Sequence, residues 1–288
     1  MAARTFAFEY WDVFTKRRFT GNPLAVFTNA NGLSTEQMAA IARETNLSET
    51  TFVLPASPAG VRTRIFTPVS ELDFAGHPTL GTAMSLWRRR MMKVVLHLNV
   101  GPVPVEYRVD SEGMYGEMVQ PEPIFAETHE ATAIAKLIGL PVTALDTRHP
   151  IQNVSTGRPN LIVLLKSRSA MRALKVDWPA VNDYFASGDR SRGFYFITAE
   201  TERGGKFLAR KLTPRTEDPV TGSAAGSAIA WLVSHKLAAS GERLMIEQGA
   251  DVSRPGELYV SAEVSGTGAT RVKVGGFCVK AWTGQMPA

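Results

Sequence analysis

Two short stretches of the chain combine residues suited to proton transfer with residues suited to anion binding. The first is DFAGHP, at residues 73–78, and the second is EDPVTGSA, at residues 217–224. In each, an aspartate and then a glycine precede a run of small apolar residues. A helix that starts there presents unpaired backbone N–H groups and a partial positive charge, and glycine lets a ligand approach them. The pattern therefore predicts two helix N-termini that hold an anion such as a small carboxylate.

The two stretches belong to an internal repeat that covers half of the chain. TPVSE at 67–71 matches TPRTE at 213–217, and GTA at 81–83 matches GSA at 226–228. Upstream, TGNP at 20–23 resembles TGRP at 156–159. For either motif alone, the favoured interpretation is an ordinary N-cap aspartate with turn glycines. Their recurrence favours one shared site instead, with each half of the chain supplying one wall. The candidate residues at the two helix starts are Asp73, Gly76, His77, Asp218, Gly222 and Ser223.

Titratable residues are few in these motifs. His77 is the one histidine inside a motif, and by itself it is more typical of a structural residue. Glu49, in NLSETTFV, lies between a predicted helix and a predicted strand, and by itself it indicates a solvated carboxylate. The sequence has no HExxH, no paired CxxC and no GxGxxG after a strand, so we expect no metal site. Cys278 is the sole cysteine, which excludes an intrachain disulfide and fits a reducing cytoplasm.

The composition is that of an ordinary soluble protein. Apolar residues make up 44% and charged residues 20%, with a formal net charge of +5. The basic run at 88–90 indicates either a nucleic-acid patch or a helix C-terminus, and the lack of interleaved aromatic residues favours the helix end. No segment has the apolar core of a signal peptide or of a membrane span. We therefore expect a cytoplasmic protein with no nucleic-acid or membrane partner.

The pattern of elements predicts the fold class. Many short strands surround one helix of small residues in each half, at about 79–87 and 223–236, and a helix without a polar face is buried. The strand–helix alternation of a doubly wound sheet is missing. We therefore predict an α+β fold of two pseudo-symmetric barrel-like domains, each a curved, mostly antiparallel sheet around a central helix. The extended segment at 121–125 is the predicted crossover, which gives domains at 1–120 and 121–272.

The motifs together resemble one family along essentially the whole chain. GNPLAVF, NLSETTFV, DFAGHPTLGTA, EDPVTGSAAG and a late EQG…RPG are similar, in order, to the PhzF-like isomerases of phenazine biosynthesis. The resemblance implies the diaminopimelate epimerase fold, with the site in the cleft between the halves and a last strand, about 273–288, returning to the first domain. It also implies that Glu49 transfers the proton and that His77 and Asp218 assist. Gly76, Gly222 and Ser223 would line the substrate pocket, with Asn22 near the site.

One departure from the wider superfamily limits the chemistry. Its epimerases carry two opposed cysteines at the positions that are Ala75 and Thr221 here, so a two-thiol racemisation is excluded. What the resemblance leaves is a cofactor-independent biosynthetic isomerase of a small carboxylated substrate, acting through the single carboxylate of Glu49. A homodimer is expected. Two alternatives stay open: a racemase or epimerase that uses Glu49 and another non-thiol base, and a non-catalytic small-molecule binder that retains the fold.

Overall fold

The structure is a computed structural model that describes residues 4–57, 60–87, 91–185, 193–266 and 268–287. The chain divides into two compact units. Unit 1 comprises Met1–Val119 with Gly275–Ala288, and unit 2 comprises Gln120–Val274. The basic run at 88–90 lies outside the described residues. None of the described helices is both long and apolar enough to cross a membrane.

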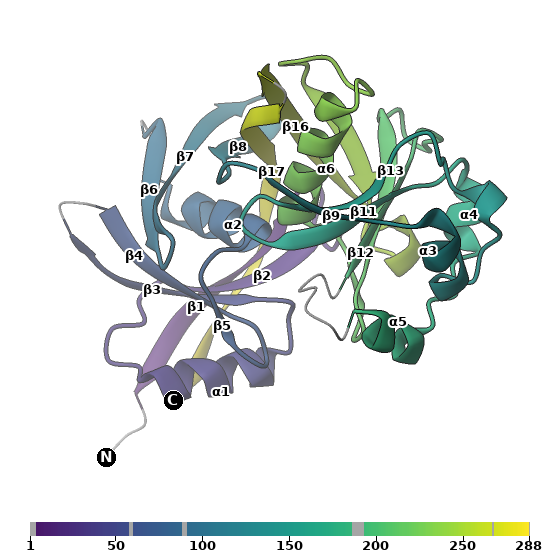
Figure 1. Cartoon of the computed structure of the whole chain (residues 1–288). Helices are drawn as coiled ribbons and strands as arrows, with labels where there is room; N and C mark the ends of the chain where they lie inside the picture. Colours follow the sequence, from purple (N-terminus) through teal and green to yellow (C-terminus); the bar gives the residue numbers. More distant parts are fainter. Residues whose placement is uncertain (1–3, 58–59, 88–90, 186–192, 267, 288) are drawn as a thin grey trace. The chain divides into compact units, whose positions relative to one another are not determined.

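Unit 1 is a closed barrel. Eight of its described strands join in the order β1, β2, β3, β4, β6, β7, β8 and β17, and β17 pairs with β1 to close the ring (Figure 1). Most pairs are antiparallel; β2–β3 and β4–β6 are parallel. The strands are β1 (Thr5–Val13), β2 (Asn22–Phe27), β3 (Thr50–Ser57), β4 (Gly60–Phe66), β5 (Glu71–Leu72), β6 (Lys93–Leu98), β7 (Gly101–Asp110), β8 (Gly113–Val119) and β17 (Gly268–Pro287), which belongs to unit 1 from Gly275 onward.

The helix inside this barrel is α2 (Gly76–Leu86), which Figure 1 shows among the strands of unit 1. Every residue from Gly76 to Ser85 is buried. The helix begins three residues before the predicted start at 79, because Gly76, His77 and Pro78 form its first turn, where proline needs no backbone donor. Gly81 fits closely, since a Cβ there would lie 2.6 Å from Leu24 Cδ2.

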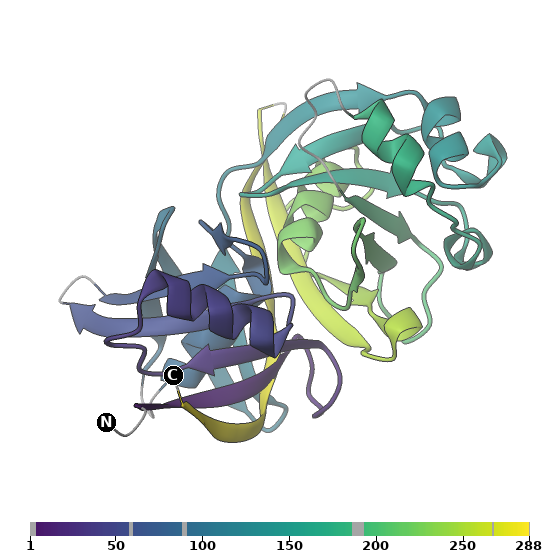
Figure 2. The same ribbon diagram turned by 90° about the horizontal axis from the view of Figure 1, so that it is seen from below.

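A second helix, α1 (Thr35–Thr45), covers the outer face of the unit 1 sheet, where it is the purple helix of Figure 2. It starts with a capping box, in which Ser34 accepts from the Gln37 backbone and the Gln37 side chain accepts from the Ser34 backbone. Its apolar side packs on aromatic residues of β2, β3 and β4, so the sheet has apolar neighbours on both faces. The cluster includes Met38, Ile41, Ala42, Phe27, Phe52 and Phe66.

Unit 2 repeats this plan. Its strands pair in the order β9, β10, β11, β12, β13, β15 and β16 around a second buried helix, α6 (Gly222–Ser234). The outer face is covered by three short helices that form one apolar cluster with β11 and β12. The strands are β9 (Ile124–His129), β10 (Ile151–Ser155), β11 (Pro159–Leu164), β12 (Phe194–Thr198), β13 (Phe207–Leu212), β14 (Glu217–Asp218), β15 (Leu244–Gln248) and β16 (Gly256–Ser265). The helices are α3 (Ala131–Leu137), η1 (Val142–Ala144), α4 (Arg168–Arg172), α5 (Trp178–Tyr184) and η2 (Ala250–Val252).

The repeated segments keep the same hydrogen bonds outside the helices. The Thr67 hydroxyl donates to the Ser70 carbonyl and accepts from its N–H, and Thr213 bonds Thr216 in the same way. Just before each turn, an arginine forms a two-fold bond with a glutamate just after it. The pairs are Arg64 with Glu71, at 2.8 and 2.6 Å, and Arg210 with Glu217, at 2.9 and 2.6 Å.

The predicted fold class is confirmed. Each unit is a barrel-like, mostly antiparallel sheet wrapped around a helix of small residues, and the outer helices are additions to that plan. Small side chains in the central helices bring the surrounding strands close, which is the reason for their composition.

The close approach in unit 2 predicts the effect of one methyl group. A Cβ on Gly226 would lie 1.9 Å from Gln120 Oε1, and that buried amide holds Gly222 and Thr156. We expect Gly226→Ala to lower the free energy of unfolding by about 1–3 kcal/mol, measured by denaturant unfolding. Gly268→Ala is the control, because a Cβ there meets nothing within 4 Å. Equal stability of the two variants would contradict the proposed contact.

Candidate active site

Glu49 and His77 come together in unit 1. Glu49 Oε2 lies 3.6 Å from His77 Nδ1, and their side chains are 12% and 4% exposed. The distance is longer than a hydrogen bond, as is common for catalytic groups before a substrate tightens them. A mostly buried carboxylate beside an imidazole can accept a proton and pass it on. The solvated surface carboxylate that NLSETTFV indicates by itself is therefore wrong.

Local structure explains why these two side chains meet. Glu49 directly precedes β3, a barrel strand that packs against α2, the helix inside the barrel. His77 is the second residue of α2, so its ring stands at the helix start. The partial positive charge of that helix end attracts a carboxylate. The N-cap residue, Ala75, makes no side-chain cap bond to this helix start.

Asn22 lies at the same end of the unit 1 barrel. It is the first residue of β2 and is fully buried. β2 runs parallel to β3, with Ala25 opposite Thr50. Asn22 and Glu49 therefore stand near the starting ends of two adjacent strands, within the unit whose helix start carries His77. The structure brings three of the predicted residues, Asn22, Glu49 and His77, to one end of one unit.

The predicted residues of unit 2 form a second set. The Thr221 hydroxyl donates to Asp218 Oδ2 at 2.5 Å, and Gln248 Nε2 donates to the Asp218 carbonyl at 2.9 Å. The same Gln248 side chain accepts from the Thr221 N–H and from the Tyr195 hydroxyl. Asp218 is thus held in a fixed orientation just before α6. Burial and the Asp218 charge raise the pKa of Tyr195, which keeps that phenol protonated.

The two aspartates of the repeat do not hold equivalent positions. In the strand ladders, Asp218 pairs with Lys211, and the matching pair in unit 1 is Leu72 with Ile65. Asp73 lies one residue further on and accepts from Asn99 Nδ2 at 3.2 Å. Neither aspartate is an N-cap residue; those positions are Ala75 and Thr221. The ordinary N-cap interpretation of both aspartates is therefore wrong.

Gly222 and Ser223 form the first turn of α6, and buried polar side chains hold their carbonyl groups. Gln120 Nε2 donates to the Gly222 carbonyl at 3.1 Å, and Thr156 donates to Gln120 Oε1 at 2.6 Å. The Ser227 hydroxyl donates to the Ser223 carbonyl at 3.2 Å. These bonds fix the helix start. Thr221, its N-cap, makes no side-chain cap bond to the helix. The N–H groups of the first turn, which point along the helix axis, therefore receive no acceptor from the Thr221 side chain.

Lys211 is a candidate residue that the motifs do not reveal. Its Nζ donates to Asn160 Oδ1 at 2.6 Å and to the Gly193 carbonyl at 3.2 Å. Burial first, and then the charge of Arg158, lower the pKa of Lys211 to about 7, against an opposing effect of Asp218. The sequence feature that could have revealed Lys211 is the repeat, in which this lysine stands where the first half has Ile65.

Cys278 lies outside these two sets of residues, and neither set forms a metal site among the described residues. The thiol is buried in β17, and burial raises its pKa to about 12, so it is a poor nucleophile near neutral pH. Among the described residues, no three His, Cys, Asp or Glu side chains lie close enough together to hold a metal ion.

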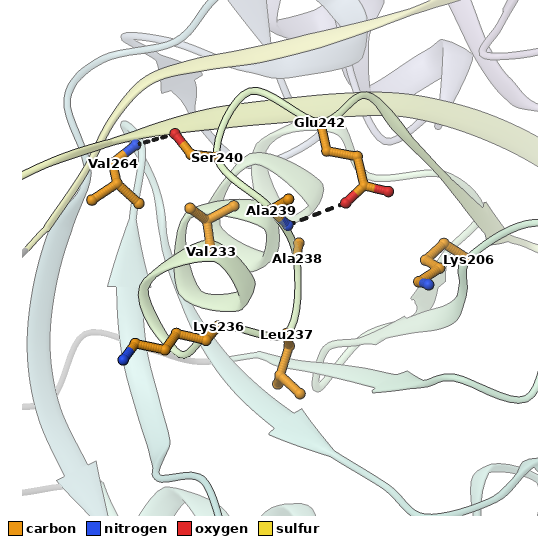
Figure 3. Close-up of a pocket in the computed structure, with 9 residues that line it drawn as sticks. All are labelled: Lys206, Val233, Lys236, Leu237, Ala238, Ala239, Ser240, Glu242 and Val264. Carbon is orange, nitrogen blue, oxygen red and sulfur yellow. Dashed lines mark hydrogen bonds between the residues drawn. The ribbon is translucent and has the colours of Figure 1, made fainter.

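A surface pocket of about 410 Å³ lies at the opposite end of α6 (Figure 3). It is formed by the end of that helix and the loop after it, where Glu242 accepts from the Ala239 N–H. α6 has 13 residues and so spans about 20 Å. This pocket is therefore remote from Asp218 and Ser223, and it contains none of the predicted site residues.

Comparison with known proteins identifies the relatives of the chain. A family model described as "Phenazine biosynthesis-like protein" (PhzC-PhzF) matches residues 11–284. The trans-2,3-dihydro-3-hydroxyanthranilate isomerase of Pseudomonas aeruginosa is 35% identical over 271 residues, covering 92% of this chain and 93% of the relative. A Bacillus anthracis phenazine biosynthesis protein of the PhzF family superposes with a TM-score of 0.86 at 27% identity, covering 99% and 100% of the two chains. A predicted epimerase from Pseudomonas aeruginosa gives 0.83 at 33% identity, covering 98% and 99%.

The buried lysine predicts a pH dependence of stability. Its pKa is about 7 in the folded protein and 10.5 for the reference side chain, so between these values the unfolded chain binds more protons. Stability therefore rises with pH in that window, by up to about 1.4 kcal/mol per pH unit for one proton. We expect the wild type to gain stability relative to Lys211→Met between pH 7 and pH 9, measured by urea unfolding. A constant difference across that range would contradict a neutral buried amine.

Proposed function

We propose that this chain, which belongs to the phenazine biosynthesis-like (PhzF) family and is an isomerase, moves a proton within a small carboxylated substrate. The pair of Glu49 and His77 is the observation that carries the proposal, because it places a carboxylate and an imidazole within 3.6 Å in a largely buried setting. Proton transfer between carbon atoms needs no more than such a pair. The reaction is therefore proposed to proceed without a cofactor.

In the proposed reaction, the Glu49 carboxylate removes a proton from a carbon next to an unsaturated or acidic group of the substrate. The electron pair left behind spreads over the conjugated system, and the double bond shifts. Glu49 then returns the proton to another carbon, so the carboxylate ends as it began. His77 holds the carboxylate in place and shields it from water, which supports repeated transfer by one group.

Asp218 and the start of α6 are proposed to form an anion-binding site in unit 2. Thr221 and Gln248 fix Asp218, and Gly222 with Ser223 offers backbone donors to an anion. Glu49 and His77 are the corresponding residues of unit 1. Asn22 completes the set from unit 1.

A second candidate reaction is a racemisation or epimerisation with Glu49 and a second base that is not a thiol. The observation that favours it is the 33% identity with a protein described as a predicted epimerase. The two reactions differ in the product. Isomerisation moves a double bond, and epimerisation inverts one carbon, so proton NMR of the product in heavy water distinguishes them.

Replacement of the proposed base tests the reaction directly. Glu49→Gln keeps the size of the side chain and removes the base, so we expect turnover to fall by about 100-fold or more. trans-2,3-Dihydro-3-hydroxyanthranilate is the first substrate to use, because the relative from Pseudomonas aeruginosa is named for it. Loss of the absorbance or NMR signals of this compound measures the rate.

The matched control for this variant is Glu44→Gln, an exposed glutamate on α1. It should leave turnover unchanged, and both variants should unfold at the wild-type temperature. Wild-type turnover by Glu49→Gln on a confirmed substrate would remove Glu49 from the mechanism. Exchange of a substrate C–H with deuterium from heavy water is the companion measurement, because it reports proton removal even where the product does not accumulate.

The state of Cys278 predicts that its replacement is tolerated by the reaction. The thiol is buried and remains protonated because its pKa is about 12. We expect Cys278→Ala and Cys278→Ser to keep turnover within a few fold of the wild type, measured with the same substrate. Loss of activity in a variant with unchanged thermal stability would show that a thiol takes part in the reaction.

A further inference from the structure

The strand ladders align the two units residue by residue. Phe66 ends β4 in unit 1, and Leu212 ends β13 in unit 2, each just before the repeated turn. These two residues pair with the first residues of β3 and β12. The residues immediately before those strands, Glu49 and Gly193, are therefore equivalent. Unit 2 has no side chain of its own at the place where unit 1 has its carboxylate.

The amine of Lys211 fills that place. Its Nζ donates to the carbonyl of Gly193, and a Cβ added to Gly193 would lie 2.8 Å from this nitrogen. Lys211 reaches the position from a different strand, β13, and Asn160 holds it with a 2.6 Å bond. Each unit therefore has an ionisable group at this position, a carboxylate in unit 1 and an amine in unit 2.

The residues around the amine are also more polar than the corresponding residues of unit 1. Three inner positions that are apolar in unit 1 are polar or charged in unit 2. Asn160 also donates to Ser227 of α6, so the polar side chains connect to the central helix. The inner face of unit 2 is therefore suited to a polar group at these positions, where unit 1 is apolar. The equivalent pairs are Leu24 and Asn160, Ile65 and Lys211, and Leu72 and Asp218.

Charged and titratable side chains of unit 2 act on Lys211. Arg158, ahead of β11, is close enough to lower the pKa of Lys211, and Asp218, on β14, is close enough to oppose that effect. Tyr195 of β12 faces the same side and stays protonated, because burial raises its pKa. α6 contributes no charged residue.

We propose that Lys211 binds the acidic group of the substrate on the inner face of unit 2. The inference rests on the proposed function, because it takes the substrate to be a small carboxylate. Lys211 donates two protons to Asn160 and Gly193, so its third N–H is the one that can bond a carboxylate oxygen. A neutral amine has no third proton, and recognition of the acid therefore requires the ammonium form.

Binding of two matched probes tests this role without any turnover. 2-Aminobenzoate carries the negative charge, and 2-aminobenzamide has the same shape without it. By calorimetry or fluorescence, we expect the wild type to prefer the acid by about 10-fold or more at pH 6. That preference should shrink several-fold by pH 8.5, because the amine loses its proton near pH 7. Failure to bind either probe at millimolar concentration would overturn the proposal, and so would a preference independent of pH.

Two variants and one control complete the test. Lys211→Met removes the amine at similar volume and should abolish the preference at both pH values while leaving binding of the amide unchanged. Gly193→Ala keeps the charge but displaces the amine, so it should weaken the preference. Lys206→Met removes an exposed lysine of the same unit and should behave as the wild type. A Lys211→Met protein that still prefers the acid would overturn the assignment. If Lys211→Met does not fold, the pH dependence of the wild type and the Gly193→Ala variant still decide.

Failure of this inference can be told from failure of the proposed function. Glu49→Gln should lose turnover and keep the preference for the acid. If Glu49→Gln retains turnover, the proposed base is wrong while the probe measurements on Lys211 stand by themselves. If Glu49→Gln behaves as predicted and Lys211→Met binds both probes like the wild type, the proton chemistry stands and the acid-binding role of Lys211 is excluded.

Discussion

The burial of a helix made of small residues inside each barrel is the constraint on which both candidate residue sets depend. Every residue of α2 from Gly76 to Ser85 and of α6 from Gly222 to Val233 is buried. Contacts as close as that of Gly226 with Gln120 fix where the helices lie. Because the helix starts are fixed, the residues that begin them are fixed as well. His77 and Ser223 are thereby presented at defined points without any flexible loop.

The two units preserve their outer faces and differ in their inner ones. The threonine turns and the arginine–glutamate pairs recur with nearly the same distances, and both stabilise the turn before the central helix of each unit. Inside the barrels, the residues that correspond by strand register differ in charge and polarity. Outer pairs maintain the geometry of the turn before each helix, so they tolerate little change. Inner positions near the helix start are where duplicated halves can acquire separate tasks.

Sequence reasoning predicted the repeat, the fold class and the family, because each rests on many residues in order. It placed Glu49 only through resemblance, since a carboxylate in NLSETTFV has no local sign of burial. It missed Lys211 because a lysine in an alternating strand reads as solvated, and only the ladder shows that it faces inward, paired with Asp218. It also treated Asp73 and Asp218 as comparable, although Leu72 is the residue of unit 1 that corresponds to Asp218 in the strand ladders. Strand register, which sequence alone does not give here, decided each of these cases.

The inner face of unit 2 is costly for stability, and that cost is consistent with function. A buried amine that loses its charge near neutral pH weakens the folded state relative to an apolar residue such as the Ile65 of unit 1. Asn160 and the Gly193 carbonyl offset part of the cost by accepting its protons. A purely structural role would be served by the apolar set already present in the other half. The chain instead keeps Lys211, Asn160 and Asp218 together, which is the arrangement expected where binding of a ligand supplies the remaining stabilisation.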